Sequence, residues 1–421
     1  MKKEKIVFGL DIGTTKIVCL AGKLNEYGKL EILGMGKSES LGVRRGIVNN
    51  IMQTVKSINH AIDIIEKDFS IKVDSVCTGI AGQHIRSLQH SDYITRNNPE
   101  KYIDKSDIEK LHKNVKQLIL LPGEEIIHVL AQEYKIDGES DINQPEGMHG
   151  SRLEATFHIV AGQTAAIKNI TKCVVESGLR VSALNLEPLA SADAVLSVEE
   201  KEAGVVLVDI GGGTTDVAIF KNGIIKHTAV IPFGGNVITE DIKEGCSIIH
   251  RDAELLKIQF GSALPSENKD SEIVSIPGLR GHDPKEISVK NLSKIIKARV
   301  EEIIDQVYRQ ITSYGFQEGK NKLIAGIVLT GGGSQLKHIK QLTEYITGMS
   351  TRIGYSNEHL CKGTLEDISN PSYATSVGLV LRGLKSHNLQ DSKVIKDHLP
   401  EEAFFENWAK KFLEYLSNGT I

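Results

Sequence analysis

The chain has 421 residues, of which 40% are hydrophobic and 25% are charged. This composition is typical of a globular protein and excludes a disordered or fibrous one. At about 150 residues per domain, the length predicts roughly two to four domains. Its 50 basic and 54 acidic side chains leave a formal charge of -4, which argues against a nucleic-acid partner. The scattered cysteines predict neither disulfides nor a zinc site, and Lys, Glu or Asp interrupts every candidate membrane span.

The N-terminal part of the chain predicts two strands followed by a helix. Alternating apolar positions indicate strands at 5–10 and 16–23, joined by the tight turn Gly13-Thr14-Thr15. Apolar residues at spacings of three and four then predict an amphipathic helix over 48–65. The apolar run of the first strand ends at Asp11, too early for the core of a signal peptide.

The pattern of predicted elements changes between residues 87 and 156, and we interpret this segment as a small inserted subdomain. A helix is expected over 106–118, a strand over 126–136 and a polar loop over 137–150. Strict α/β alternation resumes afterwards, with helices at 164–177 and 189–196 and a strand at 181–186 between them.

A second hairpin repeats the first. The apolar run 204–210 predicts a strand buried on both faces, and the turn Gly211-Gly212-Gly213-Thr214-Thr215 leads into a return strand at 216–220. Asp11 ends the first strand of one hairpin, and Asp209 occupies the same place in the other. The simplest explanation is a duplicated domain.

The two turns share the chemistry of phosphate binding. Glycines let the backbone N–H groups approach a phosphate, and threonine hydroxyls add donors. An aspartate at the end of each strand suits Mg²⁺, which prefers oxygen ligands and keeps much of its water. Either turn alone is equally well explained as a good turn sequence. Two hairpins facing each other, however, predict a site for a triphosphate between two domains.

A third glycine turn follows the strand predicted at 323–330 and precedes a helix that carries Leu336, Ile339 and Leu342. It is typical of a phosphate or ribose site, although it is weak evidence by itself. Gly36-Lys37-Ser38 is not a Walker A motif, because Glu31 occupies the position of its first glycine.

These motifs resemble the actin and heat-shock-chaperone ATPase superfamily. Residues 8–16 and 207–216 are similar to its two phosphate motifs, and 327–335 to its adenosine motif. The segments 186–192 and 373–379 are similar to its two connecting helices. The resemblance implies an α/β, actin-like (ribonuclease H-like) duplicated two-domain ATPase fold with an inserted small α+β subdomain.

Within that superfamily, the chain most resembles the bacterial FtsA family. The likeness rests on residues 42–49, 78–84, 232–235 and 253–257 and on the position of the insertion. It implies an ATP-binding, actin-like filament former at the cytoplasmic face of the inner membrane. Such a protein ties the division protein FtsZ to the membrane at the division site and hydrolyses ATP slowly, if at all.

The resemblance also implies a division of the chain. The first lobe comprises 1–86, 157–203 and 365–384, the insertion comprises 87–156, and the second lobe comprises 204–364 with a smaller subdomain at about 250–320. A flexible linker is expected at 385–400 and an amphipathic membrane-targeting helix at 401–417.

Each expected ligand has candidate residues. ATP is expected at Gly13, Thr14, Thr15, Lys16, Gly211, Gly212, Gly213, Thr214, Thr215, Gly235, Asn236, Lys257, Gly331, Gly332, Gly333 and Ser334. Mg²⁺ is expected at Asp11 and Asp209, and Glu187 is the candidate for orienting water. The lysines Lys290, Lys294 and Lys297 share one side of a predicted helix, where the resemblance implies the C-terminal peptide of FtsZ, although such a charge run is more often a solvated face.

The C-terminal segment places its aromatic residues on one helical face: Phe404, Phe405, Trp408, Phe412, Tyr415 and Leu416. We expect this face to enter a membrane interface, with docking on the protein's own body as the alternative. Four glutamates outnumber Lys410 and Lys411 between 401 and 417, so attraction to anionic lipid should be weak.

Two other functions use the same ATP site. A small-molecule kinase of the superfamily needs an acidic residue against the substrate hydroxyl, and no motif marks one. A pilus-assembly relative shares the insertion and should lack the C-terminal helix.

Overall fold

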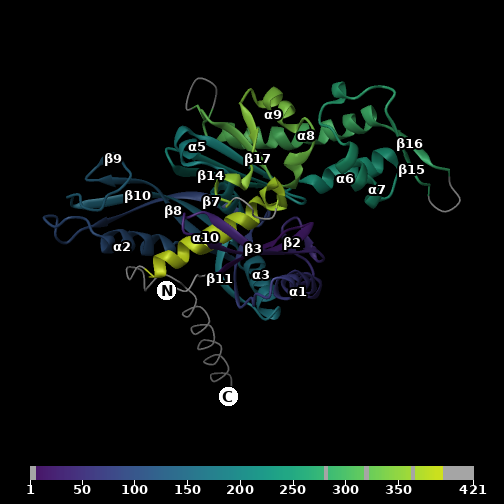
Figure 1. Ribbon diagram of the computed structural model, residues 1–421. Coiled ribbons are helices and arrows are strands. Elements are labelled where there is room, and N and C mark those ends of the chain that lie inside the picture. Colours follow the sequence, from purple (N-terminus) through teal and green to yellow (C-terminus); the bar gives the residue numbers. More distant parts are fainter. Residues whose placement is uncertain (1–5, 279–282, 317–321, 362–365, 392–421) are drawn as a thin grey trace, which may run out of the picture.

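The computed structural model describes residues 6–278, 283–316, 322–361 and 366–391 (Figure 1). Two five-stranded sheets form the centre of the molecule. The first has the order β11-β6-β1-β2-β3 and the second the order β14-β13-β12-β17-β18. Both sheets are covered by helices, as α/β alternation predicts, and the actin-like division into two lobes follows from them.

The first sheet comprises β1 (Val7–Ile12), β2 (Lys16–Leu24), β3 (Leu30–Glu39), β6 (Ser75–Ile80) and β11 (Arg180–Leu186). The helices α1 (Ile51–Asp68) and α3 (Thr164–Glu176) pack on one of its faces. The helices α4 (Glu187–Val195) and α10 (Ala374–Asp391) pack on the other and against the second lobe. A two-strand turn, β4 (Val43–Arg44) and β5 (Ile47–Val48), precedes α1.

The second sheet comprises β12 (Val205–Ile210), β13 (Thr215–Lys221), β14 (Ile224–Ile231), β17 (Gly326–Thr330) and β18 (Thr351–Ile353). Its helices are α5 (Val198–Ala203), α8 (Val289–Ser313) and α9 (Ile339–Thr347). A smaller subdomain beside it contains α6 (Gly235–Cys246), α7 (His250–Phe260), β15 (Ile273–Ile276) and β16 (Lys285–Ser288).

The predicted duplication is present in the strand pairing. In the first lobe β1 pairs antiparallel with β2 and parallel with β6, and in the second β12 pairs antiparallel with β13 and parallel with β17. Each hairpin is closed by an equivalent bond, from Gly13 N to Lys16 O at 3.1 Å and from Gly211 N to Thr214 O at 2.9 Å. The two turns therefore have the same backbone construction.

The inserted subdomain is an antiparallel sheet of order β7-β10-β8-β9 with one helix beside it. Its elements are β7 (Ile85–Thr95), α2 (Lys105–Lys116), β8 (Glu124–Ile136), β9 (Glu139–Ile142) and β10 (Arg152–Gln163). The prediction of a loop over 137–150 was wrong in part, because the strand β9 lies within this range. Asp137 and Gly138 both have positive φ angles, of 50° and 93°, and such a pair makes a two-residue hairpin turn.

The inserted subdomain is held against β14 of the second lobe by polar contacts. Ser87 Oγ donates to the Thr228 carbonyl at 2.8 Å, and Gln132 Nε2 donates to the Ile225 carbonyl at 2.6 Å. His158 Nε2 and Thr228 Oγ1 are 3.0 Å apart. Leu186 N of β11 also donates to His128 Nε2 of β8 at 3.0 Å, so the inserted subdomain contacts both lobes.

Two element boundaries differ from expectation. The helix α10 continues to Asp391, into the range 385–400 that was expected to be a linker. Arg382 and Lys385 both pair with Asp193 on α4, and this tertiary contact supports the last turns of a polar segment. The helix after the third glycine turn begins only at Ile339, because a 3-10 turn, Gly332–Gln335, comes first.

Candidate functional site

The two hairpin turns meet face to face. A methyl group built on Gly213 would lie 2.5 Å from Thr14 Oγ1 and 2.8 Å from the Cα of Arg45. A methyl group on Gly212 would collide with the side chain of Thr15. Since Gly212 and Gly213 belong to the second lobe and their neighbours to the first, glycine is required where the lobes interlock.

Four carboxyl groups gather behind the turns, around a cavity of about 100 Å³. Asp11 and Asp209 are the next-to-last residues of β1 and β12. Asp216 faces Asp209 from β13, and Glu187 begins α4. The cavity is also lined by Gly13, Thr14, Thr15, Lys16, Gly211, Gly212, Gly213, Thr214, Gly331 and Gly332. The expected phosphate and metal residues of both lobes therefore converge.

Hydroxyl groups from the two connecting helices hold the metal candidates. Ser191 Oγ on α4 donates to Asp209 Oδ2 at 2.6 Å, and Thr375 Oγ1 on α10 donates to the same oxygen at 3.2 Å. Ser376 Oγ donates to Asp11 Oδ2 at 3.1 Å. These hydroxyls were not among the predicted site residues, although the segments that carry them were recognised as connecting helices.

Asp216 is a further site residue that the sequence analysis missed. Its side chain is buried, lines the cavity, and has no hydrogen-bond partner at Oδ1. Its place in the second hairpin gave no signal, because the first hairpin carries Val18 at the corresponding register position. A buried carboxylate oxygen without a partner indicates a group that binds there.

The carboxyl cluster carries more negative charge than the chain neutralises. Burial raises the pKa of Asp11 to about 6, although Lys16 opposes this rise. Burial also raises the pKa of Asp209. Burial and repulsion between the carboxylates raise the pKa of Glu187 and of Asp216 well above their ordinary values. A cation beside the cluster would reverse these shifts.

The residues present fit a hydrated Mg²⁺ ion. Within the described ranges, no three His, Cys, Asp or Glu side chains form a ready-made ligand set. Mg²⁺ demands few direct protein ligands, because it keeps several waters and also binds substrate phosphates. Asp11 and Asp209 are buried, and a hydroxyl group donates a hydrogen bond to each of them. Hydrogen bonds of this kind orient carboxylates that hold a metal ion and its waters.

A second cavity, of about 400 Å³, adjoins the first and shares Thr15, Gly211, Gly212 and Gly332 with it. The remaining residues of its lining are Gly235, Asn236, Ile238, Glu254, Lys257, Ile258, Gly261, Gly333, Gln335, Leu336 and Lys337. Its mixture of apolar side chains and a few polar groups suits a flat heteroaromatic ring with a sugar.

Lys257 is fixed at the edge of this second cavity. Its Nζ donates to the Gly235 carbonyl at 2.9 Å and contacts Thr239 Oγ1 and Glu254 Oε2, both at 2.7 Å. Burial lowers the pKa of the amine, whereas Glu254 opposes this shift. The expected position of Lys257 beside a base or ribose is compatible with this geometry.

Two expected ATP residues line neither cavity. Thr215 Oγ1 donates to the Phe233 carbonyl at 2.8 Å, and Ser334 Oγ donates to the Gly331 carbonyl at 2.8 Å. Both side chains are buried, so they shape their turns from within. Lys290, Lys294 and Lys297 lie on α8, outside both cavities. Residues 401–417, with the aromatic face expected there, lie outside the described residues.

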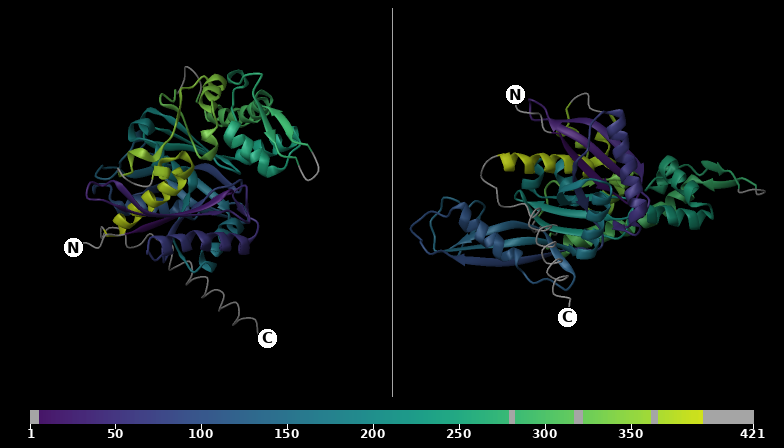
Figure 2. Two further views of the ribbon diagram at one scale, coloured as in Figure 1. Left: turned by 45° about the vertical axis from the view of Figure 1, so that its right-hand side comes forward. Right: turned by 90° about the horizontal axis from the view of Figure 1, so that it is seen from below.

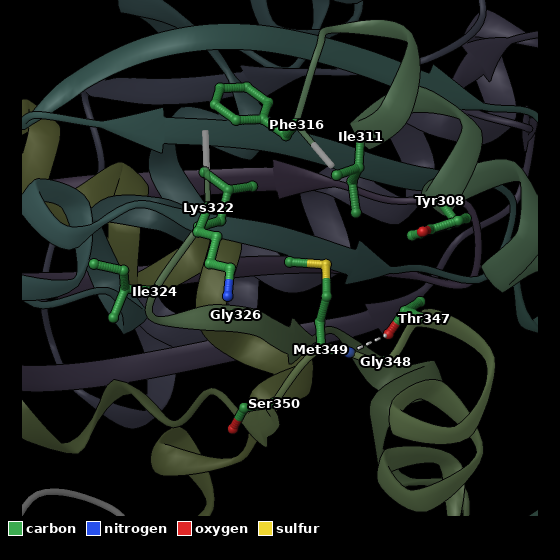
Figure 3. Close-up of a pocket in the computed structure, with 11 residues that line it drawn as sticks. Tyr308, Ile311, Phe316, Lys322, Ile324, Gly326, Thr347, Gly348, Met349 and Ser350 are labelled. Carbon is green, nitrogen blue, oxygen red and sulfur yellow. Dashed lines mark hydrogen bonds between the residues drawn. The ribbon is translucent and has the colours of Figure 1, made fainter. Parts of the chain in front are cut away.

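A separate cavity of about 310 Å³ lies at the other end of β17 (Figure 3). Figure 3 shows Met349 and Lys322 within it, and Gly326 at the start of the strand. The third glycine turn, which lines the two cavities described above, follows Thr330 at the opposite end of the same strand. No acidic residue is among the described residues that line this cavity, which is therefore not part of the carboxyl cluster.

Comparison with known structures agrees with this fold. The PilM-PilN type IV pilus biogenesis complex has a chain with a TM-score of 0.62 and 16% identity, over 90% of this chain and 98% of that one. MreB 5 of Spiroplasma citri bound to AMPPNP has a TM-score of 0.54 and 16% identity, over 94% and 99%. At such low identity these likenesses show the actin-like fold alone.

Comparison of sequences shows the family. The model "Cell division protein FtsA" matches residues 206–378, and "SHS2 domain inserted in FTSA" matches residues 82–161. The FtsA of Pseudomonas aeruginosa is 39% identical over 92% of this chain and 91% of its own length. The FtsA of Escherichia coli K12 is 33% identical over 98% of both. The chain belongs to the FtsA family of cell division proteins.

Proposed function

We propose that the chain binds Mg-ATP between its two lobes and acts as a filament-forming adaptor that ties FtsZ to the inner membrane. One observation supports nucleotide binding above all. The glycine-threonine turns of the two lobes interlock in front of a carboxyl cluster whose negative charge the chain does not fully neutralise. The family membership favours cell division over the kinase and pilus functions.

The backbone N–H groups of the two turns and the hydroxyls of Thr14 and Thr15 would receive the phosphates. Asp11 and Asp209 would hold the hydrated magnesium ion, which supplies charge neutralisation to the phosphates. Lys16 interacts electrostatically with Asp11 and Asp209, and it would add a cationic donor to the phosphates. Because the ligand would touch both lobes, its binding favours the closed arrangement.

Glu187 and Asp216 are the residues placed to act on a water molecule. Both line the phosphate cavity, and the pKa of each is raised by burial and by neighbouring carboxylates. A raised pKa makes a carboxylate, once ionised, a stronger proton acceptor. We therefore assign any ATP hydrolysis to this pair, with Glu187 orienting the water and Asp216 supporting it.

The adaptor role uses two regions away from the cleft. Lys290, Lys294 and Lys297 recur along one side of α8 and would receive the acidic C-terminal peptide of FtsZ. The aromatic face at 401–417 would enter the membrane interface. Among the described residues, every helix is too short or too polar to cross a membrane, so peripheral attachment is the mode that we propose.

Equilibrium binding of a fluorescent ATP analogue, with and without Mg²⁺, tests the nucleotide part. Asp209→Ala should weaken magnesium-dependent binding at least about tenfold, because it removes a charged ligand and leaves Ser191 Oγ without its acceptor. Asp270→Ala is the matched control, since Asp270 is an exposed aspartate paired with Lys290. Equal binding by the wild type and Asp209→Ala, or no binding by the wild type, would refute the site.

Emission from Trp408 tests the membrane part. We expect a blue shift on adding vesicles, together with co-sedimentation, and loss of both after truncation behind Pro400. Unchanged emission at saturating lipid would show that the aromatic face does not enter the bilayer.

A further inference from the structure

The loop that follows α2 in the inserted subdomain presents apolar side chains to solvent. Ile119 is 94% exposed and Leu121 is 61% exposed, and Pro122 beside them is exposed as well. Loop tips are ordinarily polar, so two neighbouring exposed apolar side chains on one anchored tip make it a candidate contact surface. We call residues 117–123 the apolar loop.

The apolar loop is anchored at both ends. On the α2 side, Leu118 N donates to the Val115 carbonyl at 3.1 Å. On the β8 side, Glu124 N donates to the Leu121 carbonyl at 3.1 Å, and Thr164 N donates to the Gly123 carbonyl at 2.9 Å. Because its base is fixed, the loop holds Ile119 outward even though no apolar neighbour covers it.

Lysines lie on the helix that leads into this tip. Lys110, Lys113 and Lys116 are exposed on α2, and Lys113 and Lys116 occupy its last turn. Within the residues that the structure describes, none of these three lysines forms an ion pair. An apolar tip beside unpaired lysines has the chemistry of a contact with an anionic lipid surface.

The loop also lies on the appropriate side of the molecule. In Figure 1, α2 lies on the lower side of the inserted sheet, and the last turns of α10 reach the same lower left region. The right-hand view of Figure 2 shows the inserted subdomain and the end of α10 projecting toward the same end. The described end of α10 and the inserted subdomain therefore lie toward the same end of the molecule.

We propose that the apolar loop, through Ile119 and Leu121 and the lysines of α2, is a second contact with an anionic bilayer. This inference rests on the proposed membrane attachment through residues 401–417. That segment has more glutamates than lysines and gives little attraction to anionic lipid. The α2 lysines supply this attraction, and the loop orients the inserted subdomain against the surface.

A bilayer fits this feature better than a protein partner does. None of the three cavities described above is lined by a residue of the apolar loop. A stable protein interface buries about 800 Å² on each side, whereas two apolar side chains on a convex tip cover far less. Insertion of such a tip at the headgroup boundary is weak alone but is multiplied once another segment is attached.

The test uses the full-length chain with an environment-sensitive label at Ile119→Cys, in a background where the partly buried Cys361 is replaced by serine. The control label is at Tyr345→Cys, because Tyr345 is 81% exposed on α9 at the opposite, upper side of Figure 1. With phosphatidylglycerol vesicles, the label at 119 should shift to the blue and be quenched by brominated lipid. The label at 345 should not change.

Binding variants give the second measurement. Lys113→Glu with Lys116→Glu should weaken co-sedimentation with phosphatidylglycerol vesicles about tenfold or more and leave binding to phosphatidylcholine unchanged. A shift of Trp408 with no change at 119 would overturn the inference and leave the C-terminal attachment intact. An absence of vesicle binding by the wild type would overturn both. Loss of filaments but not of vesicle binding in Ile119→Asp would assign the loop to a second copy instead.

Discussion

Replacement of Gly212 by alanine tests whether the two lobes must interlock for ATP to bind. The new methyl group would collide with Thr15 Cγ2 and would lie 3.4 Å from Asn236 Oδ1. Overpacking of this kind costs about 1 to 3 kcal/mol. Because the collision is between lobes, the cost falls on the closed state, and ATP affinity should decrease about 5- to 150-fold.

A second substitution separates this clash from damage to the phosphate site. Thr15→Ser removes Cγ2 and keeps the hydroxyl, so the double variant Gly212→Ala, Thr15→Ser should recover most of the affinity. Gly332→Ala is the matched control, since its methyl group would meet nothing closer than Ser372 Cβ at 4.0 Å, although Gly332 lines the same cavities. Equilibrium titration with a fluorescent ATP analogue measures all four proteins. Wild-type affinity in Gly212→Ala, or no recovery in the double variant, would refute the interlocking of the lobes.

Three further predictions address catalysis, the base pocket and the inserted subdomain. Asp216→Asn should slow ATP turnover about a hundredfold with little change in ATP affinity, and equal turnover would remove Asp216 from the mechanism. Lys257→Ala should weaken ATP binding about tenfold in the same titration, whereas Lys243→Ala, an exposed lysine paired with Glu240, should not. Burial lowers the pKa of His158 from 6.5 to about 4, so unfolding takes up a proton between these pH values. The contribution of His158 to the free energy of unfolding should therefore fall by about 3 kcal/mol as the pH decreases from 6.5 to 4, and denaturant titrations of His158→Gln should lack this part of the slope. Equal slopes for the wild type and His158→Gln would contradict the buried neutral histidine.

The insertion shows why some local elements escaped sequence analysis. The strand β9 is short and mostly exposed, so it has no apolar alternation, and only its pairing with β8 defines it. The end of α10 was missed for a related reason. Lys385 reads as a linker residue in the sequence, whereas in the fold it pairs with Asp193 from a distant segment.

The site shows the same division between local and tertiary information. Asp11 and Asp209 were recognisable because each ends an apolar strand before a glycine turn. The roles of Ser191, Thr375 and Asp216 could not be recognised from the sequence, because a single hydroxyl or a single aspartate carries no local pattern. Thr215 and Ser334 share the motif with the residues that line the cavities, and only their orientation separates them from those residues.

The sequence alone determined the duplicated strand-turn-strand units, the position of the insertion and the resemblance to the FtsA family, because these depend on spacing within short segments. The tertiary structure alone decided that the two turns interlock, that four carboxyl groups share one cavity, and that Ile119 stands uncovered. Burial, close approach and excess charge arise between segments that are remote in the chain, and no local pattern encodes them.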